Sequence, residues 1–215
     1  MASFGAAIKL PFSSFKKMTI GAVLFIIPIV NFFSFGYVLT VAKSAMKGKF
    51  ELPEWTGWGN LFEKGLVGMI ISFIWGIPAM IAYIAFFGTI LVASFTTKEP
   101  PAMTGISVAG MLITGPLILL IYYVMPAAVL SYIEEGNFGA GFKFGKIFGK
   151  AFTGKWLGAY FLSFVWMVAA ALIAMLLILV TAITIIGPLI VYIYLLFVMI
   201  TTMYALLGEA YGAKK

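Results

Sequence analysis

The sequence predicts an all-α integral membrane protein: a helical bundle of four full spans, formed by a duplicated helical hairpin, with an N-terminal re-entrant or kinked segment and interfacial amphipathic helices. Two observations predict this class. Hydrophobic residues make up 63% of the 215 residues and charged residues 10%, whereas soluble domains have roughly 45–50% apolar and about 25% charged residues. Several charge-free stretches also reach the length of about 20 residues that a membrane span requires. Together they exclude a soluble fold.

The full spans are predicted from the charge-free stretches. The first two are Leu66–Ser94 and Ile106–Ile133. No charge occurs from Trp156 to Gly208, which is long enough for two helices. Gly187–Pro188 lies near the middle of that stretch, and Gly-Pro is a turn signal. The last two spans are therefore expected at Trp156–Thr181 and Pro188–Leu207.

The N-terminal apolar stretch, Thr19–Ala42, is interrupted by Pro28 and Asn31. It is either one kinked span or a re-entrant hairpin, and the lysines favour the hairpin. With four full spans, 13 of the 14 lysines lie on one side and only Lys98 lies on the other. A fifth span would divide them ten to four. Because basic residues concentrate in cytoplasmic loops, we expect a multi-pass protein of the cell membrane with both termini cytoplasmic.

An internal repeat indicates the same organisation. Ser72-Phe73-Ile74-Trp75 recurs as Ser163-Phe164-Val165-Trp166, and Gly115-Pro116-Leu117-Ile118 recurs as Gly187-Pro188-Leu189-Ile190. Chance similarity is the alternative, because apolar sequence uses few residue types. Two copies of equal orientation would be related by an axis along the membrane normal. The repeat divides a single membrane domain, 1–215, into an N-terminal segment (1–48), a first hairpin (49–136) and a second hairpin (137–215).

The segment between the two hairpins, Gly141–Lys155, has an amphipathic pattern. Lys143, Lys146 and Lys150 follow helical spacing, and phenylalanines occupy the opposite face. This pattern is typical of a helix that lies in the headgroup plane, although a solvated connector is the alternative. We therefore expect contacts with lipid headgroups at Lys143, Lys146, Lys150 and Lys155.

A second loop, Lys43–Lys64, carries two tryptophans. Leu52-Pro53-Glu54 suits a helix start, with proline at the first position and an acid in the first turn. Trp55 and Trp58 then fall on one face of the predicted helix. Tryptophan is common where a span meets the membrane surface, and substrate binding is the alternative role.

The first third of the chain resembles a known family. Ile27-Pro28-Ile29-Val30-Asn31, Leu52-Pro53-Glu54-Trp55 and Gly59-Asn60-Leu61-Phe62 carry the resemblance, together with Gly36, Tyr37, Gly48 and Gly65. They are similar to the opening of a largely archaeal polytopic membrane family, domain of unknown function 4013. The resemblance implies a membrane protein and no particular activity.

Catalysis is not expected of this composition. The chain has no Cys, His, Asp, Arg or Gln, so most zinc, haem and iron–sulfur sites lack ligands, and the usual general base near neutral pH is missing. All seven glutamates lie at span ends or in loops. We therefore expect no enzyme, no catalytic residue, no metal and no cofactor. Nucleic acid is not an expected partner, because no soluble basic domain is present.

Two non-enzymatic functions remain. Small residues along the spans permit close helix packing, which favours a structural or accessory membrane protein whose partners are lipids and a second copy or another membrane protein. The alternative is a passive channel or transporter for a small or amphiphilic solute. Asn31 is a possible midplane polar site for such a solute. Its other expected role is to satisfy backbone groups freed near Pro28.

Overall fold

The computed structural model describes residues 4–97, 105–184 and 186–213, and within them the chain forms helices and no strand. This confirms the all-α class. The helices are α1 (Phe4–Lys9), η1 (Leu10–Ser13), α2 (Phe15–Ile26), α3 (Asn31–Ala45), α4 (Trp58–Thr97), α5 (Gly105–Glu135), η2 (Phe138–Phe142), α6 (Phe144–Ala151), α7 (Gly154–Thr181) and α8 (Ile186–Gly212).

Four of these helices are long and apolar enough to cross a membrane. They include the segments Trp58–Ala85 in α4 and Gly110–Glu135 in α5, and the whole of α7 and α8. The four predicted spans therefore coincide with four apolar helices. Lys98, on which the predicted orientation depends, lies outside the described residues.

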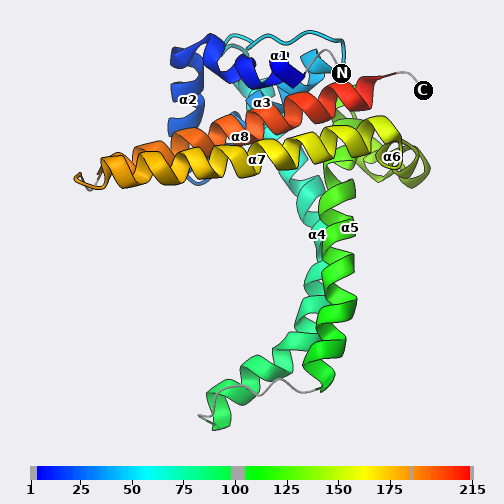
Figure 1. Ribbon diagram of the computed structural model, residues 1–215. Helices are drawn as coiled ribbons and strands as arrows, with labels where there is room; N and C mark the ends of the chain where they lie inside the picture. The colour runs from blue at the N-terminus through cyan, green and yellow to red at the C-terminus, as the bar shows by residue number, and fades with distance from the viewer. Residues whose placement is uncertain (1–3, 98–104, 185, 214–215) are drawn as a thin grey trace.

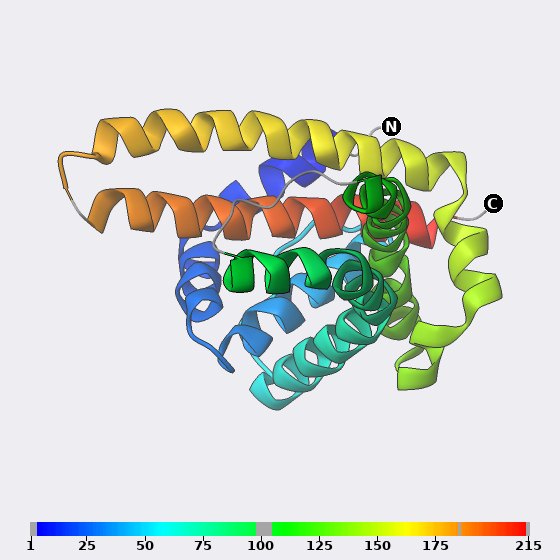
Figure 2. The same cartoon turned by 90° about the horizontal axis from the view of Figure 1, so that it is seen from below.

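The two hairpins leave the rest of the molecule in different directions. The outer parts of α4 and α5 form a stem that projects away from α1–α3, whereas α7 and α8 run side by side across its base (Figure 1). The view from below shows the stem nearly end-on beside the length of α7 and α8 (Figure 2). In this arrangement only one hairpin can stand perpendicular to a single membrane plane. The two hairpins therefore do not run parallel to each other (Figure 1).

Close helix crossings on α3 explain the two directions. A Cβ on Gly36 of α3 would collide with the backbone of Leu61, and a Cβ on Gly65 of α4 would collide with the backbone of Phe32. Glycine at both positions therefore allows α3 and α4 to cross in backbone contact. Gly65 was expected among the small residues that permit close packing, and here it packs within the chain.

A second crossing joins α3 to α8. Gly208 and Gly212 of α8 lie against the backbone of Ala42 and Met46 near the end of α3. The two glycines are four residues apart, so they occupy one face of α8. Because α4 and α8 cross α3 at different points, each hairpin takes its own direction from α3.

The N-terminal apolar stretch, Thr19–Ala42, is divided between two helices, α2 and α3, rather than forming one kinked helix. α2 ends before Pro28, and Ile29 has a positive φ of 70° in the turn that precedes α3. The Ser34 hydroxyl donates a 2.8 Å hydrogen bond to the Gly21 carbonyl oxygen, which joins the two helices across the turn. This helix–turn–helix has the form of a hairpin.

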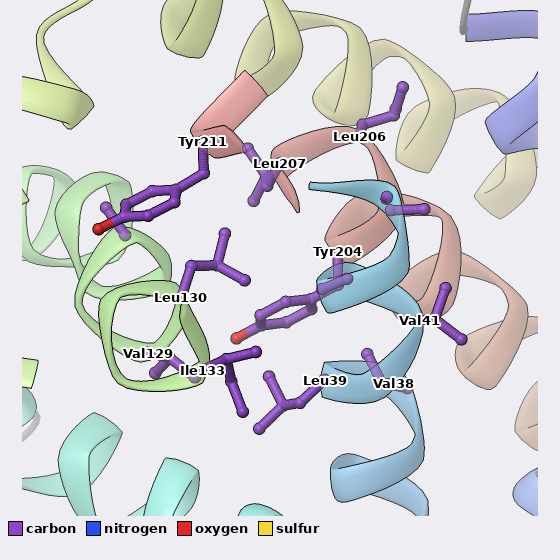
Figure 3. Packing of buried hydrophobic residues seen from close by; sticks show 14 of the residues in the cluster. Val38, Leu39, Val41, Val129, Leu130, Ile133, Tyr204, Leu206, Leu207 and Tyr211 are labelled. Atoms are coloured by element: carbon purple, nitrogen blue, oxygen red, sulfur yellow. The ribbon is translucent and has the colours of Figure 1, made fainter. Parts of the chain in front are cut away.

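The core lies where α3, α5 and α8 meet. Leu39 of α3, Leu130 of α5 and Leu207 of α8 are fully buried, and the side chains of the three helices converge there (Figure 3). Tyr204 also points into this cluster (Figure 3). The body of the molecule is therefore an N-terminal helix pair packed on the inner ends of both hairpins.

The repeated segments share some local structure. Ser72 and Ser163 each donate to the carbonyl oxygen four residues earlier in the helix. Gly136, with φ of 76°, ends α5, whereas the matching Gly208 lies inside α8. These features neither require nor exclude duplication, so the repeat stays a prediction.

The loop before α4 differs from the expected helix start at Pro53. Residues 49–54 are irregular, and α4 begins at Trp58. Contacts with other segments hold this loop: the Lys17 ammonium donates to the Leu52 carbonyl oxygen at 2.9 Å, and the Tyr37 hydroxyl donates to that of Pro53 at the same distance. These donors lie on α2 and α3, so contacts with distant helices hold residues 52 and 53 in an irregular loop. Pro53 and Glu54 therefore do not start a helix, although their residue types suit a helix start.

Candidate functional site

The connector between the hairpins, Asn137–Thr153, is the region that the lysine pattern singled out. One amphipathic helix was expected over 141–155, but the structure has the short helix η2, then α6, then a break before α7. The caps account for the division. The Asn137 side chain accepts from the Ala140 backbone N–H, and the Thr153 hydroxyl accepts from that of Trp156 at the start of α7. Such side chains favour helix starts.

The connector packs against the base of the stem and is hydrogen-bonded to it. Ile147 and Ala151 of α6 are fully buried. The Trp75 indole N–H of α4 donates to the Gly141 carbonyl oxygen at 2.9 Å, and the Tyr123 hydroxyl of α5 donates to that of Ala151 at 2.7 Å. These side chains fix α6 beside the stem.

Lys143 and Lys146, two of the predicted headgroup lysines, form ion pairs with glutamates at the end of α5. The Lys143 ammonium lies 2.6 Å from a Glu135 carboxylate oxygen. Lys146 contacts both Glu134 and Glu135. The two adjacent carboxylates at the end of α5 thus share one lysine. Partial burial works against the charged form of Lys146, but hydrogen bonds from its ammonium to the two carboxylates outweigh burial and raise its pKa.

The other two lysines lie near the C-terminal end of α8. The Lys150 ammonium donates to the Tyr211 carbonyl oxygen at 2.7 Å and to that of Ala213 at 3.3 Å. A cation in this position also interacts favourably with the helix dipole. Lys155 and Glu209 line a cavity of about 270 Å³ between α1, α7 and α8. The structure thus gives Lys150 a role within the fold that spacing alone did not indicate.

Large aromatic side chains of the connector remain exposed beside these lysines. Phe138, Phe144 and Phe152 are all more than two-fifths exposed. Phenylalanines were expected on the apolar face opposite the lysines; Phe144 and Phe152 are exposed, whereas Ile147 and Ala151 are buried. The apolar face is thus only partly used by the core. Exposed aromatic rings next to lysines are typical of segments at a membrane surface.

An apolar groove lies where the connector meets the stem. It has a volume of about 350 Å³ and is lined by Ile74, Trp75, Pro78, Leu117, Leu120, Ile121, Val124, Phe142, Phe144 and Phe148. Its wall therefore combines α4, α5, η2 and α6. The lysine pattern did not reveal this groove, because its residues come from three separate parts of the chain.

Asn31 lies just after the turn at Pro28. It is the first residue of α3 and is half-buried, and its buried side-chain oxygen Oδ1 accepts no hydrogen bond within the described residues. That oxygen therefore does not satisfy backbone N–H groups near Pro28. The backbone N–H of Asn31 instead donates to the Ile27 carbonyl oxygen at 2.9 Å. Whether a solute contacts this side chain stays a prediction.

The two tryptophans of the loop before α4 form part of an aromatic stack. The Trp55 ring lies 4.1 Å from the Tyr37 ring, almost parallel to it, and 5.5 Å from the Trp58 ring. The Trp55 indole N–H donates to the Lys17 carbonyl oxygen. Trp55 thus packs against the fold, while Trp58 remains exposed.

Metal-binding groups do not gather within the described residues, where no three acidic side chains come together. A family model described as "Protein of unknown function (DUF4013)" matches residues 20–179, from α2 to the end of α7. No curated protein and no solved structure matches the chain significantly.

Proposed function

The chain belongs to the DUF4013 family, whose description gives no activity, and we propose that it is a non-enzymatic, structural or accessory membrane protein that forms oligomers. In this proposal both termini are cytoplasmic, and the connector contacts lipid headgroups. The supporting observation is the exposure of α7. Only 6% of the residues in its most apolar 18-residue stretch are buried.

The outer face of α7 needs a covering other than water. Phe161, Val168 and Leu172 are exposed, whereas Ser163 and Ala170 are buried. Small buried residues allow close packing of α7 against α8. The large residues of the outer face are left for lipid or for another helix. A second copy of the chain is the partner that we propose.

Cysteine cross-linking tests this proposal directly, because the chain has no natural cysteine. We expect Val168→Cys or Leu172→Cys to form disulfide-linked dimers in native membranes under mild oxidation. Ala170→Cys is the matched control on the buried face and should remain monomeric. Failure of both outward variants, with a monomeric mass in detergent, would contradict an oligomer built on this face.

Solute flux distinguishes the accessory function from a passive conduit. Vesicles reconstituted with the chain should release small neutral and charged solutes no faster than vesicles without it. Protein-dependent flux would instead support the channel or transporter. In that case Asn31 would be the first candidate for contact with the solute, because its side-chain oxygen is buried in an apolar segment and has no hydrogen-bond partner among the described residues.

A further inference from the structure

We propose that the apolar groove between the stem and α6 binds one acyl chain of an anionic phospholipid, whose phosphate is held by Lys143. This inference rests on the proposed membrane placement of the connector. It adds a defined lipid site to a surface that would otherwise be covered by bulk lipid.

The shape of the groove suits a chain that lies along the stem. On α5 the groove extends from Leu117 to Val124, which is about 10 Å at 1.5 Å per residue. On α4 it follows Ile74 to Pro78. Both stretches run outward from the level of α6, so an occupant that begins at the connector would follow the stem.

The chemistry of the groove favours an acyl chain over a polar solute. All ten lining side chains are apolar or aromatic, and their only strong polar donor, the Trp75 indole N–H, is already bonded to Gly141. Leu120 and Phe144 are exposed at its edge, so in a bilayer the groove opens towards lipid. An empty groove would forfeit dispersion contacts on one side, and an acyl chain restores them.

Lys143 is the lysine that adjoins the groove residues in the sequence. Lys143 lies in the sequence between Phe142 and Phe144, which both line the groove. Its ammonium has three donors, and the side chain is 54% exposed although it is paired with Glu135. An exposed ion pair of this kind is weak, so the same ammonium can also bind a phosphate oxygen.

The local charge balance points in the same direction. Lys143 and Lys146 pair with the two carboxylates Glu134 and Glu135, whereas Lys150 donates to backbone carbonyl oxygens at the end of α8. These five side chains therefore carry one net positive charge. A phosphodiester headgroup with one net negative charge would neutralise it. A zwitterionic headgroup would leave it in place, so the site should prefer the anionic lipid.

Lipid binding to the purified full chain tests the site. We would titrate the detergent-solubilised protein with phosphatidylglycerol and with phosphatidylcholine of the same acyl chains, and count bound lipids by native mass spectrometry. The wild type should retain one phosphatidylglycerol in preference to phosphatidylcholine. Leu120→Trp fills the groove and should weaken the binding of both lipids at least tenfold. Lys143→Gln should abolish the preference but retain binding.

Matched controls separate the groove from general lipid contact. Leu119 is also exposed on α5 but does not line the groove, so Leu119→Trp should bind as the wild type does. Lys49→Gln removes one positive charge elsewhere and should keep the preference. If Leu120→Trp fails to fold, Leu117→Phe fills the groove with a smaller change.

Three results would overturn the site: no retained lipid in the wild type, wild-type binding by the groove-filling variant, or equal losses in Leu119→Trp and Leu120→Trp. Each differs from failure of the proposed function. If the protein is a monomer, but the groove-filling variant still loses the bound lipid, oligomerisation is contradicted and the lipid site is not. A cross-linked dimer with unaltered lipid binding in that variant contradicts the groove alone.

Discussion

Single glycines fix where the helices cross. The absence of a side chain at Gly36 and at Gly65 lets α3 and α4 meet at backbone distance. In the sequence, the small residues along the spans indicate close packing but not which glycines meet the backbone of another helix. At both positions an added Cβ would meet backbone atoms of the opposite helix, which cannot move aside as a flexible side chain can.

Substitution of Gly36 tests this crossing at the residue scale. Gly36→Ala should destabilise the protein by about 1–3 kcal/mol, as overpacking does, although alanine is the better helix former. Gly76→Ala in α4 is the control, because open space surrounds that position, and it should leave stability equal or higher. Thermal unfolding of both proteins in the same detergent measures the difference. Equal melting temperatures would show that the crossing tolerates a methyl group.

Among the elements, α6 combines two kinds of attachment to the stem. Ile147 and Ala151 are buried in the core, whereas Lys143 and Lys146 form ion pairs on the surface. Burial of an aliphatic side chain contributes more to stability than an exposed ion pair does. The lysines therefore remain available for contacts with lipid while apolar residues hold the helix.

The two attachments predict unequal effects of mutation. Ile147→Ala should cost about 2–5 kcal/mol, because it leaves a cavity in the core. Lys146→Gln should cost at most about 1 kcal/mol, because surface ion pairs are weak. Melting temperatures and the rate of proteolysis within the connector would compare them. A larger loss for Lys146→Gln would mean that the charge cluster, rather than the core, holds α6.

For the whole molecule, the divergence of the hairpins bears on topology. Four apolar helices and nearly one-sided lysines predict that both hairpin tips lie opposite the termini. The arrangement in Figure 1 instead directs α7 and α8 across the stem. Both hairpins can cross the same bilayer only if α7 and α8 are turned, relative to the stem, from the direction seen in Figure 1.

Single cysteines at three positions distinguish these possibilities. With an impermeant thiol reagent applied outside intact cells, Thr97→Cys and Ile183→Cys should be labelled and Ser13→Cys should not. The chain without cysteine provides the background. Labelling of Ser13→Cys together with Thr97→Cys would contradict the re-entrant segment. Protection of Ile183→Cys, with labelling of Thr97→Cys, would place α7 and α8 along the cytoplasmic surface.

Composition and charge spacing by themselves determined the class of this protein and the number of its apolar helices. A span depends on the length of one uninterrupted apolar stretch, which the linear sequence contains in full. The candidate lysines were also recognisable, because helical spacing is local. Their partners were not: Glu134 lies 12 residues from Lys146, and the carbonyl of Tyr211 lies 61 residues from Lys150.

Only the tertiary structure decided which faces of the helices meet. The direction of each hairpin depends on contacts at Gly36 and Gly208 with backbone from other helices, and no local pattern encodes such a contact. The apolar groove arises in the same way, from Trp75, Leu120 and Phe144 of three elements. Hydrophobicity, a property of single residues, thus set the class, whereas complementarity between distant surfaces set the shape and the candidate site.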